Sequence, residues 1–211
     1  MKIAIIGATG MAGRAIYREA IARGHEVTAF VRDLNKAEGL LGPGYFIKKS
    51  LYQIGAANLH GYDVVINAFA NHTHPIENFD ALTYLLRIGR KIDSRFIFIL
   101  GASSLKREDG QLLYDSLSKL ANNEAWIDEP KFGVDALYVL QHDAQNVNWT
   151  AISPQQEFVD GPASDYMTGR DELIYAEDGK SHVTTGNIAT AILNEIEEPR
   201  FIGERFTVAD K

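Results

Sequence analysis

Short apolar segments alternate with longer amphipathic segments over the first 150 residues of the chain. Most of the apolar segments are nearly continuous in Val, Ile, Phe and Ala, which is typical of parallel strands that helices cover on both faces. The predicted strands are Lys2–Ile6, Glu26–Val31, Tyr45–Lys48, Asp63–Ala68, Arg95–Leu100 and Trp149–Ser153. Because strands that alternate with helices imply right-handed crossovers, we predict an α/β fold with a Rossmann-type doubly wound parallel sheet.

Three amphipathic segments are predicted to form the helices between these strands. Met11–Arg23 places alanine and isoleucine on one face and is followed by Gly24, a typical residue after a helix end. A second helix is predicted over Ile76–Ile92, directly after Pro75, and a third over roughly Gly133–Asn146.

The end of the chain has a different pattern, which predicts a small C-terminal lobe on the substrate side of the sheet. The stretch PQQEFVDGPASDYMTG is predicted to be a long polar loop. The next stretch, DELIYAEDGKSHV, is predicted to be a hairpin that turns at Asp178-Gly179. A helix capped by Thr184 or Thr185 and a last strand, RFTVAD, complete the chain.

Length and composition limit the function classes. At 211 residues the chain is predicted to be a single domain over 1–211, with 154–183 as a loop and hairpin on the substrate side within it. A net charge of −7 argues against nucleic acid or an anionic membrane as partner. The absence of cysteine excludes disulfides and thiolate catalysis. With no signal peptide and no apolar run of about 20 residues, we expect a cytoplasmic monomer or homodimer that acts on a small molecule.

The loop GATGMAG lies between the first strand and the first helix. In such a loop Gly7 permits the tight turn, Gly10 lets the backbone approach a pyrophosphate, and Gly13 lets the helix pack close to the strand. Amides at the helix start then face the anion. No Gly-Lys-Ser/Thr follows, so a dinucleotide is favoured over a nucleoside triphosphate.

The end of the second predicted strand indicates which dinucleotide binds. There the sequence reads FVRD, and an arginine at this place favours a 2′-phosphate whereas an acidic residue favours a free ribose hydroxyl. Adjacent side chains of an extended segment point in opposite directions, so only Arg32 or Asp33 faces the ribose. Because Arg32 directly ends the apolar run, it is preferred and NADPH is the predicted cofactor, with NADH as the alternative.

Several stretches, in this order and spacing, resemble one known group of proteins. KIAIIGATGMAG, FVRD, GASSL, WTAISP and FTVAD are similar to the NADH-flavin reductase group of the atypical short-chain dehydrogenases/reductases. This group is related to biliverdin-IXβ/flavin reductase and to NmrA-like regulators. The resemblance covers almost the whole chain and implies an NAD(P)H-dependent reductase of the flavin-reductase type.

Position by position, the resemblance implies where the cofactor is bound. Ser50 stands where the group often has an aspartate beside the adenine. The implied cofactor contacts are Gly7, Thr9, Gly10, Met11, Ala12, Gly13, Arg32, Ser50, Leu51, Ala68, Phe69, Ala70, Ser153 and Pro154. Ser103 and Ser104 match the serine-bearing turn beside the nicotinamide and are the implied catalytic residues. Gln155, Gln156 and Phe158 begin the loop implied to cover the substrate.

The chain departs from the wider superfamily in one respect. The Tyr-x-x-x-Lys pair that supplies the proton in carbonyl reduction is absent, since Tyr114 is followed four residues on by Ser118 and Tyr138 by His142. A flavin delocalises the charge that hydride brings and takes its proton from solvent, so a flavin or a similar conjugated substrate is predicted. The alternatives are a non-catalytic, NADP-sensing regulator of the NmrA type and, less favoured, a nucleotide-dependent epimerase.

Two other motifs argue against further classes of chemistry. His72 and His74 stand two residues apart, but no carboxylate lies close in the motif, so a polar loop is favoured and no metal site is predicted. In GASSL the second glycine of a nucleophile elbow is replaced by Leu105, which disfavours a serine hydrolase. The segment 115–132 is interpreted as a flap or an oligomer contact.

Overall fold

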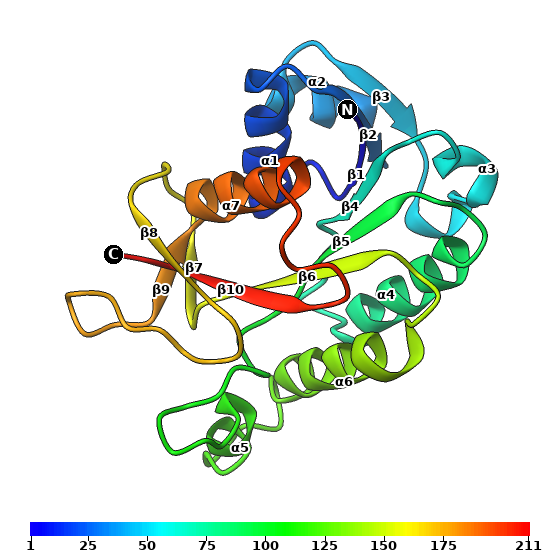
Figure 1. Ribbon diagram of the computed structural model, residues 1–211. Coiled ribbons are helices and arrows are strands. Elements are labelled where there is room, and N and C mark those ends of the chain that lie inside the picture. The colour runs from blue at the N-terminus through cyan, green and yellow to red at the C-terminus, as the bar shows by residue number, and fades with distance from the viewer.

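The computed structural model describes all residues, 1–211, and has a central sheet with helices on both faces (Figure 1). The eight strands lie in the order β3-β2-β1-β4-β5-β6-β10-β8. All neighbours in this sheet are parallel except β10 and β8, which are antiparallel. The strands are β1 Lys2–Ile6, β2 Glu26–Val31, β3 Tyr45–Lys48, β4 Val64–Asn67, β5 Arg95–Ile99, β6 Trp149–Pro154, β8 Tyr166–Gly169 and β10 Arg205–Asp210. The predicted Rossmann-type α/β fold is confirmed.

Two pairs of helices cover the two faces of this sheet (Figure 1). On one face α1, Met11–Ala22, packs against α7, Thr185–Glu197. On the other face α4, Ile76–Gly89, packs against α6, Asp128–Asp143. The shorter helices are α2 Leu34–Leu41, the 3-10 turn η1 Leu51–Gln53, α3 Ala56–Leu59 and α5 Leu113–Leu117. The buried apolar residues accordingly form two large clusters, of 23 and 20 residues, one on each side of the sheet.

The sheet topology fixes where a nucleotide can bind. β1 pairs in parallel with both β2 and β4, so the direction in which the chain adds strands reverses at β1. Ligands of doubly wound sheets bind at the carboxyl ends of the strands beside such a reversal. The glycine loop begins at Gly7, directly after β1, and therefore lies at this point of the sheet.

The third long helix begins earlier than the sequence predicted. α6 spans Asp128–Asp143 instead of starting at Gly133. Pro130 is tolerated because the first helical turn has free amides, and Asp128 and Glu129 suit the positive end of the helix dipole. The segment 115–132, interpreted from the sequence as a flap or an oligomer contact, contains the end of α5 and the start of α6.

The C-terminal lobe also differs from the prediction. The stretch expected to be a loop contains β7, Glu157–Val159, and β8. The turn at Asp178-Gly179 forms, with Gly179 at φ +78° and a hydrogen bond from Ala176 N to Lys180 O at 2.8 Å. The predicted hairpin is wrong, however, because β9, His182–Thr184, pairs in parallel with β7 instead of with the segment before the turn. Thr184 caps α7, as predicted, by accepting a hydrogen bond from the amide of Asn187.

No helix of the structure has both the length and the apolar sequence that crossing a bilayer requires.

Candidate functional site

The glycine loop is shaped by two backbone approaches that only glycine allows. Gly7 has φ +84°, and a Cβ on it would lie 2.5 Å from the carbonyl oxygen of Ala68, at the end of β4. A Cβ on Gly13 would lie 2.2 Å from the carbonyl oxygen of Gly7. At Gly10 the corresponding approach, to the same oxygen, is 3.2 Å. The start of α1 is therefore pressed against the end of β1, as the spacing of the glycines predicted.

The same loop presents amide groups with no partner inside the protein. Gly10 N donates to Gly7 O, and Arg14 N donates to Gly10 O, each at 3.0 Å. The three amides between them, on Met11, Ala12 and Gly13, donate to no backbone or side-chain acceptor. No acidic side chain occupies the first turn of α1 either. Free amides and the positive end of the helix dipole fit the pyrophosphate of a dinucleotide.

The end of β2 separates the roles of two adjacent charged residues. Asp33 is the N-cap of α2, and its Oδ1 accepts a hydrogen bond from Lys36 N at 3.0 Å. Arg32 is exposed and forms no hydrogen bond or ion pair. The carboxylate thus stabilises α2 while the guanidinium remains free for a ligand.

Two further segments continue this half of the site. Ser50 lies after β3, and its amide donates to Gln53 Oε1 at 2.9 Å, whereas the Leu51 side chain is buried in the core. Ala68 follows β4, and its amide donates to Ile6 O at 2.9 Å. The Ala68 carbonyl touches the glycine loop, and Phe69 is partly buried against the core beside exposed Ala70. The predicted contacts from Thr9 to Ala70 therefore come from adjoining loops.

The serine turn after β5 is brought to the same edge of the sheet, but its hydroxyls lie below the surface. Ser103 is 5% exposed, and its Oγ has no hydrogen-bond partner. A Cβ on Gly133 of α6 would lie 2.6 Å from that Oγ. Ser104 is also buried, and its Oγ accepts from Arg205 Nη1 at 3.2 Å. Direct contact of either serine with an acceptor remains a prediction.

The end of β6 is held by the same arginine. Ser153 is fully buried, and its Oγ accepts from Arg205 Nη1 at 2.9 Å. Pro154, the last residue of β6, is also buried. Sequence reasoning missed Arg205, because an arginine that begins a strand carries no motif and its contacts lie 52 and 101 residues away.

The residues predicted to bind substrate lie in three different environments. Gln155 is 1% exposed, its Nε2 donates to Thr207 Oγ1, and its Oε1 accepts from Ile174 N and Ser181 Oγ. Its amide is therefore buried and held by three hydrogen bonds inside the protein, and the geometry does not support a contact with substrate. Gln156 is exposed, and Phe158 of β7 packs in part against the core.

Comparison with known proteins agrees with this geometry. The model of the family described as NAD(P)H-binding matches residues 7–199. The chain belongs to the NAD(P)H-binding family. This NAD(P)H-binding protein is 31% identical to the uncharacterized protein YwnB of Bacillus subtilis. The match covers 100% of this chain and 99% of YwnB.

Two crystal structures are also similar over the full length. A Lactobacillus casei protein is 39% identical with a TM-score of 0.94, covering 100% of this chain and 99% of that chain. A Streptococcus pneumoniae protein called a "putative NADH-flavin reductase" is 32% identical with a TM-score of 0.87, covering 100% of both chains. The resemblance drawn from the sequence motifs is confirmed, and a nicotinamide cofactor is the ligand of this family.

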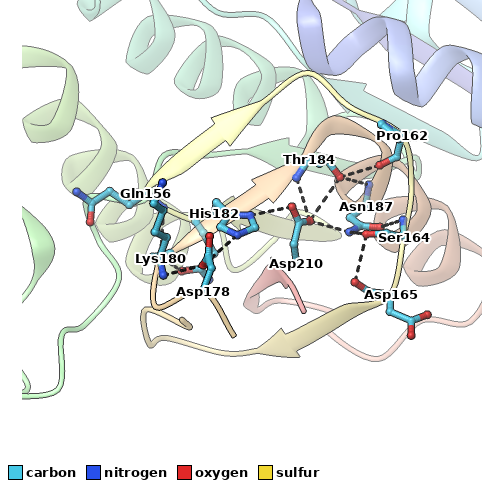
Figure 2. A network of polar contacts seen from close by, with 12 residues as sticks. Gln156, Pro162, Ser164, Asp165, Asp178, Lys180, His182, Thr184, Asn187 and Asp210 are labelled. Atoms are coloured by element: carbon cyan, nitrogen blue, oxygen red, sulfur yellow. Dashed lines mark hydrogen bonds and ion pairs between the residues drawn. The ribbon is translucent and has the colours of Figure 1, made fainter. Parts of the chain in front are cut away.

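A polar network orders the lobe of this NAD(P)H-binding protein beside the sheet (Figure 2). Asp210 Oδ1 accepts from Asn187 Nδ2 at 2.7 Å and from Thr184 N at 3.0 Å. Asp210 Oδ2 contacts His182 Nδ1 at 3.0 Å, and His182 Nε2 lies 3.4 Å from Asp178. The backbone amide of Lys180, with further help from His182, lowers the pKa of Asp178. The network therefore ties the turn of the lobe to the end of β10.

A further polar contact joins two segments of the protein, and two cavities lie beside α7. His72 Nδ1 contacts Glu129 Oε1 at 2.6 Å, which joins the loop after β4 to α6. No group of three or more His, Cys, Asp or Glu side chains is placed to hold a metal ion. Cavities of about 370 and 580 Å³ flank α7, the first beside β8 and β10 and the second beside α1 and residues 160–163.

Proposed function

We propose that this protein is an NADPH-dependent oxidoreductase that transfers hydride to a flavin or a similar conjugated acceptor. Membership of the NAD(P)H-binding family and the unpartnered amides of the glycine loop support the nicotinamide cofactor. The name of the Streptococcus pneumoniae relative supports a flavin as the acceptor.

The preference for NADPH rests on the end of β2. A 2′-phosphate needs a cation, and the exposed guanidinium of Arg32 has no competing partner. The neighbouring carboxylate, which would repel the phosphate, is engaged as the cap of α2. Arg32 is therefore assigned to the 2′-phosphate.

The observation that carries the choice of acceptor is the approach of Gly133 to Ser103. The helix packed on the serine turn presents a glycine there, so it brings no proton-donating side chain to Ser103. Tyr114, in the first turn of α5, donates its amide hydrogen to Ser103 O, but no lysine follows it four residues on, as the Tyr-x-x-x-Lys pair requires. Tyr138 is 60% exposed and stacks on His142 at the surface. An acceptor that needs no enzyme-bound acid fits this arrangement.

The protein's part in the reaction is accordingly to bind and to orient. Bound NADPH supplies a hydride from its nicotinamide ring. The amides at the start of α1 hold the pyrophosphate, and Arg32 holds the 2′-phosphate. The acceptor gains two electrons with the hydride and a proton from solvent, and NADP⁺ leaves. Holding two flat rings in contact supplies the rate enhancement through proximity.

Steady-state oxidation of NADPH tests this proposal with FMN, with riboflavin and without an acceptor. We expect turnover that requires a flavin. In Arg32→Ala we expect kcat/KM for NADPH to fall about ten- to hundredfold and that for NADH to stay unchanged, because a charge-assisted hydrogen bond is lost. Arg87→Ala is the matched control, since Arg87 is exposed on α4 and forms no ion pair. Tight NADPH binding without turnover would instead support the NmrA-type regulator.

A further inference from the structure

Arg205 joins three segments that are far apart in the sequence. Its Nη1 donates to Ser104 Oγ at 3.2 Å and to Ser153 Oγ at 2.9 Å. Its Nη2 donates to the carbonyl oxygen of Ser104 at 3.3 Å and to Asp171 Oδ1 at 2.7 Å. Its Nε donates to the same Asp171 oxygen at 3.2 Å. All five N–H groups of the guanidinium therefore have an acceptor.

Fold stability alone does not explain this arginine. Its side chain is 2% exposed, and its single carboxylate partner, Asp171, is 47% exposed. Burial lowers the pKa of Arg205, although Asp171 counteracts this. Apolar side chains of similar volume commonly replace a buried ion pair without loss of stability. The guanidinium is instead matched to the geometry of the groups that it contacts.

Those groups lie at the nicotinamide end of the site. The pyrophosphate cradle is at β1 and β4, and Arg32 marks the adenosine side at β2, so the other half of a dinucleotide extends toward β5 and β6. The serine turn follows β5, and Ser153 lies near the carboxyl end of β6. The buried guanidinium of Arg205 donates hydrogen bonds to Ser104 of the turn and to Ser153.

The lobe is attached to the same turn. Lys106 N donates to Asp171 O at 2.6 Å, and Leu173 N donates to Lys106 O at 2.8 Å. Leu105 and Leu173 share a small buried cluster. The side chain of Asp171 then connects this segment to the guanidinium of Arg205.

We propose that Arg205 is a positioning residue for the nicotinamide end of the cofactor. It fixes the serine turn against β6 and the 171–173 segment, and it acts on the cofactor through that turn without touching it. Lysine cannot replace it, because an ammonium has three donors and no planar fork. The proposal rests on cofactor binding at the glycine loop, as set out under the proposed function, and does not depend on the identity of the acceptor.

Comparing the affinities for NADPH and for 2′-phospho-ADP-ribose, which lacks the nicotinamide, tests this role. In Arg205→Lys we expect the affinity for NADPH to fall about tenfold, and that for the fragment to stay within about twofold. The matched control is Arg95→Lys. Arg95 is equally buried and pairs with Glu195, but its hydrogen bonds go to Thr150 and Glu195 and none reaches the serine turn. We expect this variant to lose stability and to keep both affinities.

Three results would overturn the proposal: an equal loss for both ligands in Arg205→Lys, no loss for NADPH, or the same selective loss in Arg95→Lys. If Arg205→Lys does not fold, Asp171→Asn decides, because it weakens the ion pair that holds the guanidinium and lies outside the implied cofactor contacts. A selective loss for NADPH supports the proposal, and its absence refutes it.

Turnover with flavin is measured separately from the two affinities. A wild-type protein that oxidises no NADPH with flavin refutes the proposed acceptor, while the ratio of the two affinities still decides the role of Arg205. A wild-type protein that binds the fragment as tightly as NADPH refutes the role of Arg205, because the nicotinamide end then contributes no affinity.

Discussion

Gly13 faces the carbonyl oxygen of Gly7 so closely that a Cβ on Gly13 would lie 2.2 Å from it. Both partners are backbone, so neither can move without displacing β1 or α1. This contact places the free amides of Met11 and Ala12 at the carboxyl end of β1. The binding of a dinucleotide and the packing of the first helix on the first strand therefore depend on the same glycine.

Gly13→Ala is expected to damage both properties. Overpacking at a backbone contact should lower the free energy of unfolding by about 1–3 kcal/mol and abolish detectable NADPH binding. Urea unfolding and calorimetric titration measure the two effects. Gly39→Ala is the control, because Gly39 lies inside α2 with open space around it and should gain about 0.5–1 kcal/mol. Unchanged NADPH binding in Gly13→Ala would show that the pyrophosphate does not bind at the glycine loop.

Asp33→Ala distinguishes a helix cap from a ribose ligand. Loss of the hydrogen bond to Lys36 N should lower the free energy of unfolding by about 1 kcal/mol. The affinity for NADH should not fall, because the carboxylate does not reach the ribose in this account. Titration with NADH and with NADPH decides between the two roles. A selective loss of NADH affinity would assign Asp33 to the ribose.

Two tyrosines form a matched pair for the effect of a buried hydroxyl. Tyr17 Oη is buried without a hydrogen-bond partner, and burial raises the pKa of Tyr17. Tyr84 Oη donates to Ile54 O at 2.9 Å. Tyr17→Phe should leave the free energy of unfolding unchanged or raise it, whereas Tyr84→Phe should lower it by about 1 kcal/mol. Urea unfolding of both variants measures the two free energies. A larger loss of stability in Tyr17→Phe than in Tyr84→Phe would contradict the prediction.

The lowered pKa of Glu197 makes the free energy of unfolding depend on pH. Burial alone would raise the pKa of Glu197, but hydrogen bonds from His25 and Arg23, with their charges, outweigh it and hold the pKa below its usual range. A lowered folded-state pKa stabilises the protein above the unfolded pKa of about 4.3, and this contribution is lost as the pH falls through the folded value. Because the side chain is 36% exposed, the contribution is below about 1 kcal/mol.

Unfolding of the wild type and of Glu197→Gln at about pH 7 and about pH 3.5 measures this contribution. We expect the variant to be less stable at the higher pH and the gap to narrow at the lower one. Glu198→Gln is the control, because Glu198 is largely exposed and pairs only with Arg200. A gap that widens in acid would contradict the assigned direction.

The sheet and the cofactor loop could be predicted because their signals are local. Short apolar runs gave the limits of β1, β2 and β3, and glycine spacing gave the approach of α1 to β1. The lobe could not be predicted in this way. β9 pairs with β7 because Val183 and Phe158 pack into the core, and the turn at Gly179 carries no information about that partner.

In the candidate site, too, local contacts could be predicted from the sequence and tertiary contacts could not. Asp33 caps α2 by accepting a hydrogen bond from Lys36 N, so its carboxylate does not pair with Arg32. A contact between residues only three apart is one that a sequence can indicate. The burial of Ser103 depends on Gly133, and that of Ser153 on Arg205, which are tertiary contacts. Such contacts follow from the packing of α6 and β10, so neither the burial of the Gln155 amide nor the contacts of Arg205 could be inferred from motifs.

Hydride transfer to a flavin can be observed by mixing the protein anaerobically with NADPH and FMN and following the absorbance. We expect the bands of NADPH and of oxidised flavin to disappear together in a one-to-one ratio, at a rate that falls in Arg32→Ala. NADPH bound tightly at the glycine loop, with both bands unchanged, would contradict hydride transfer to a flavin.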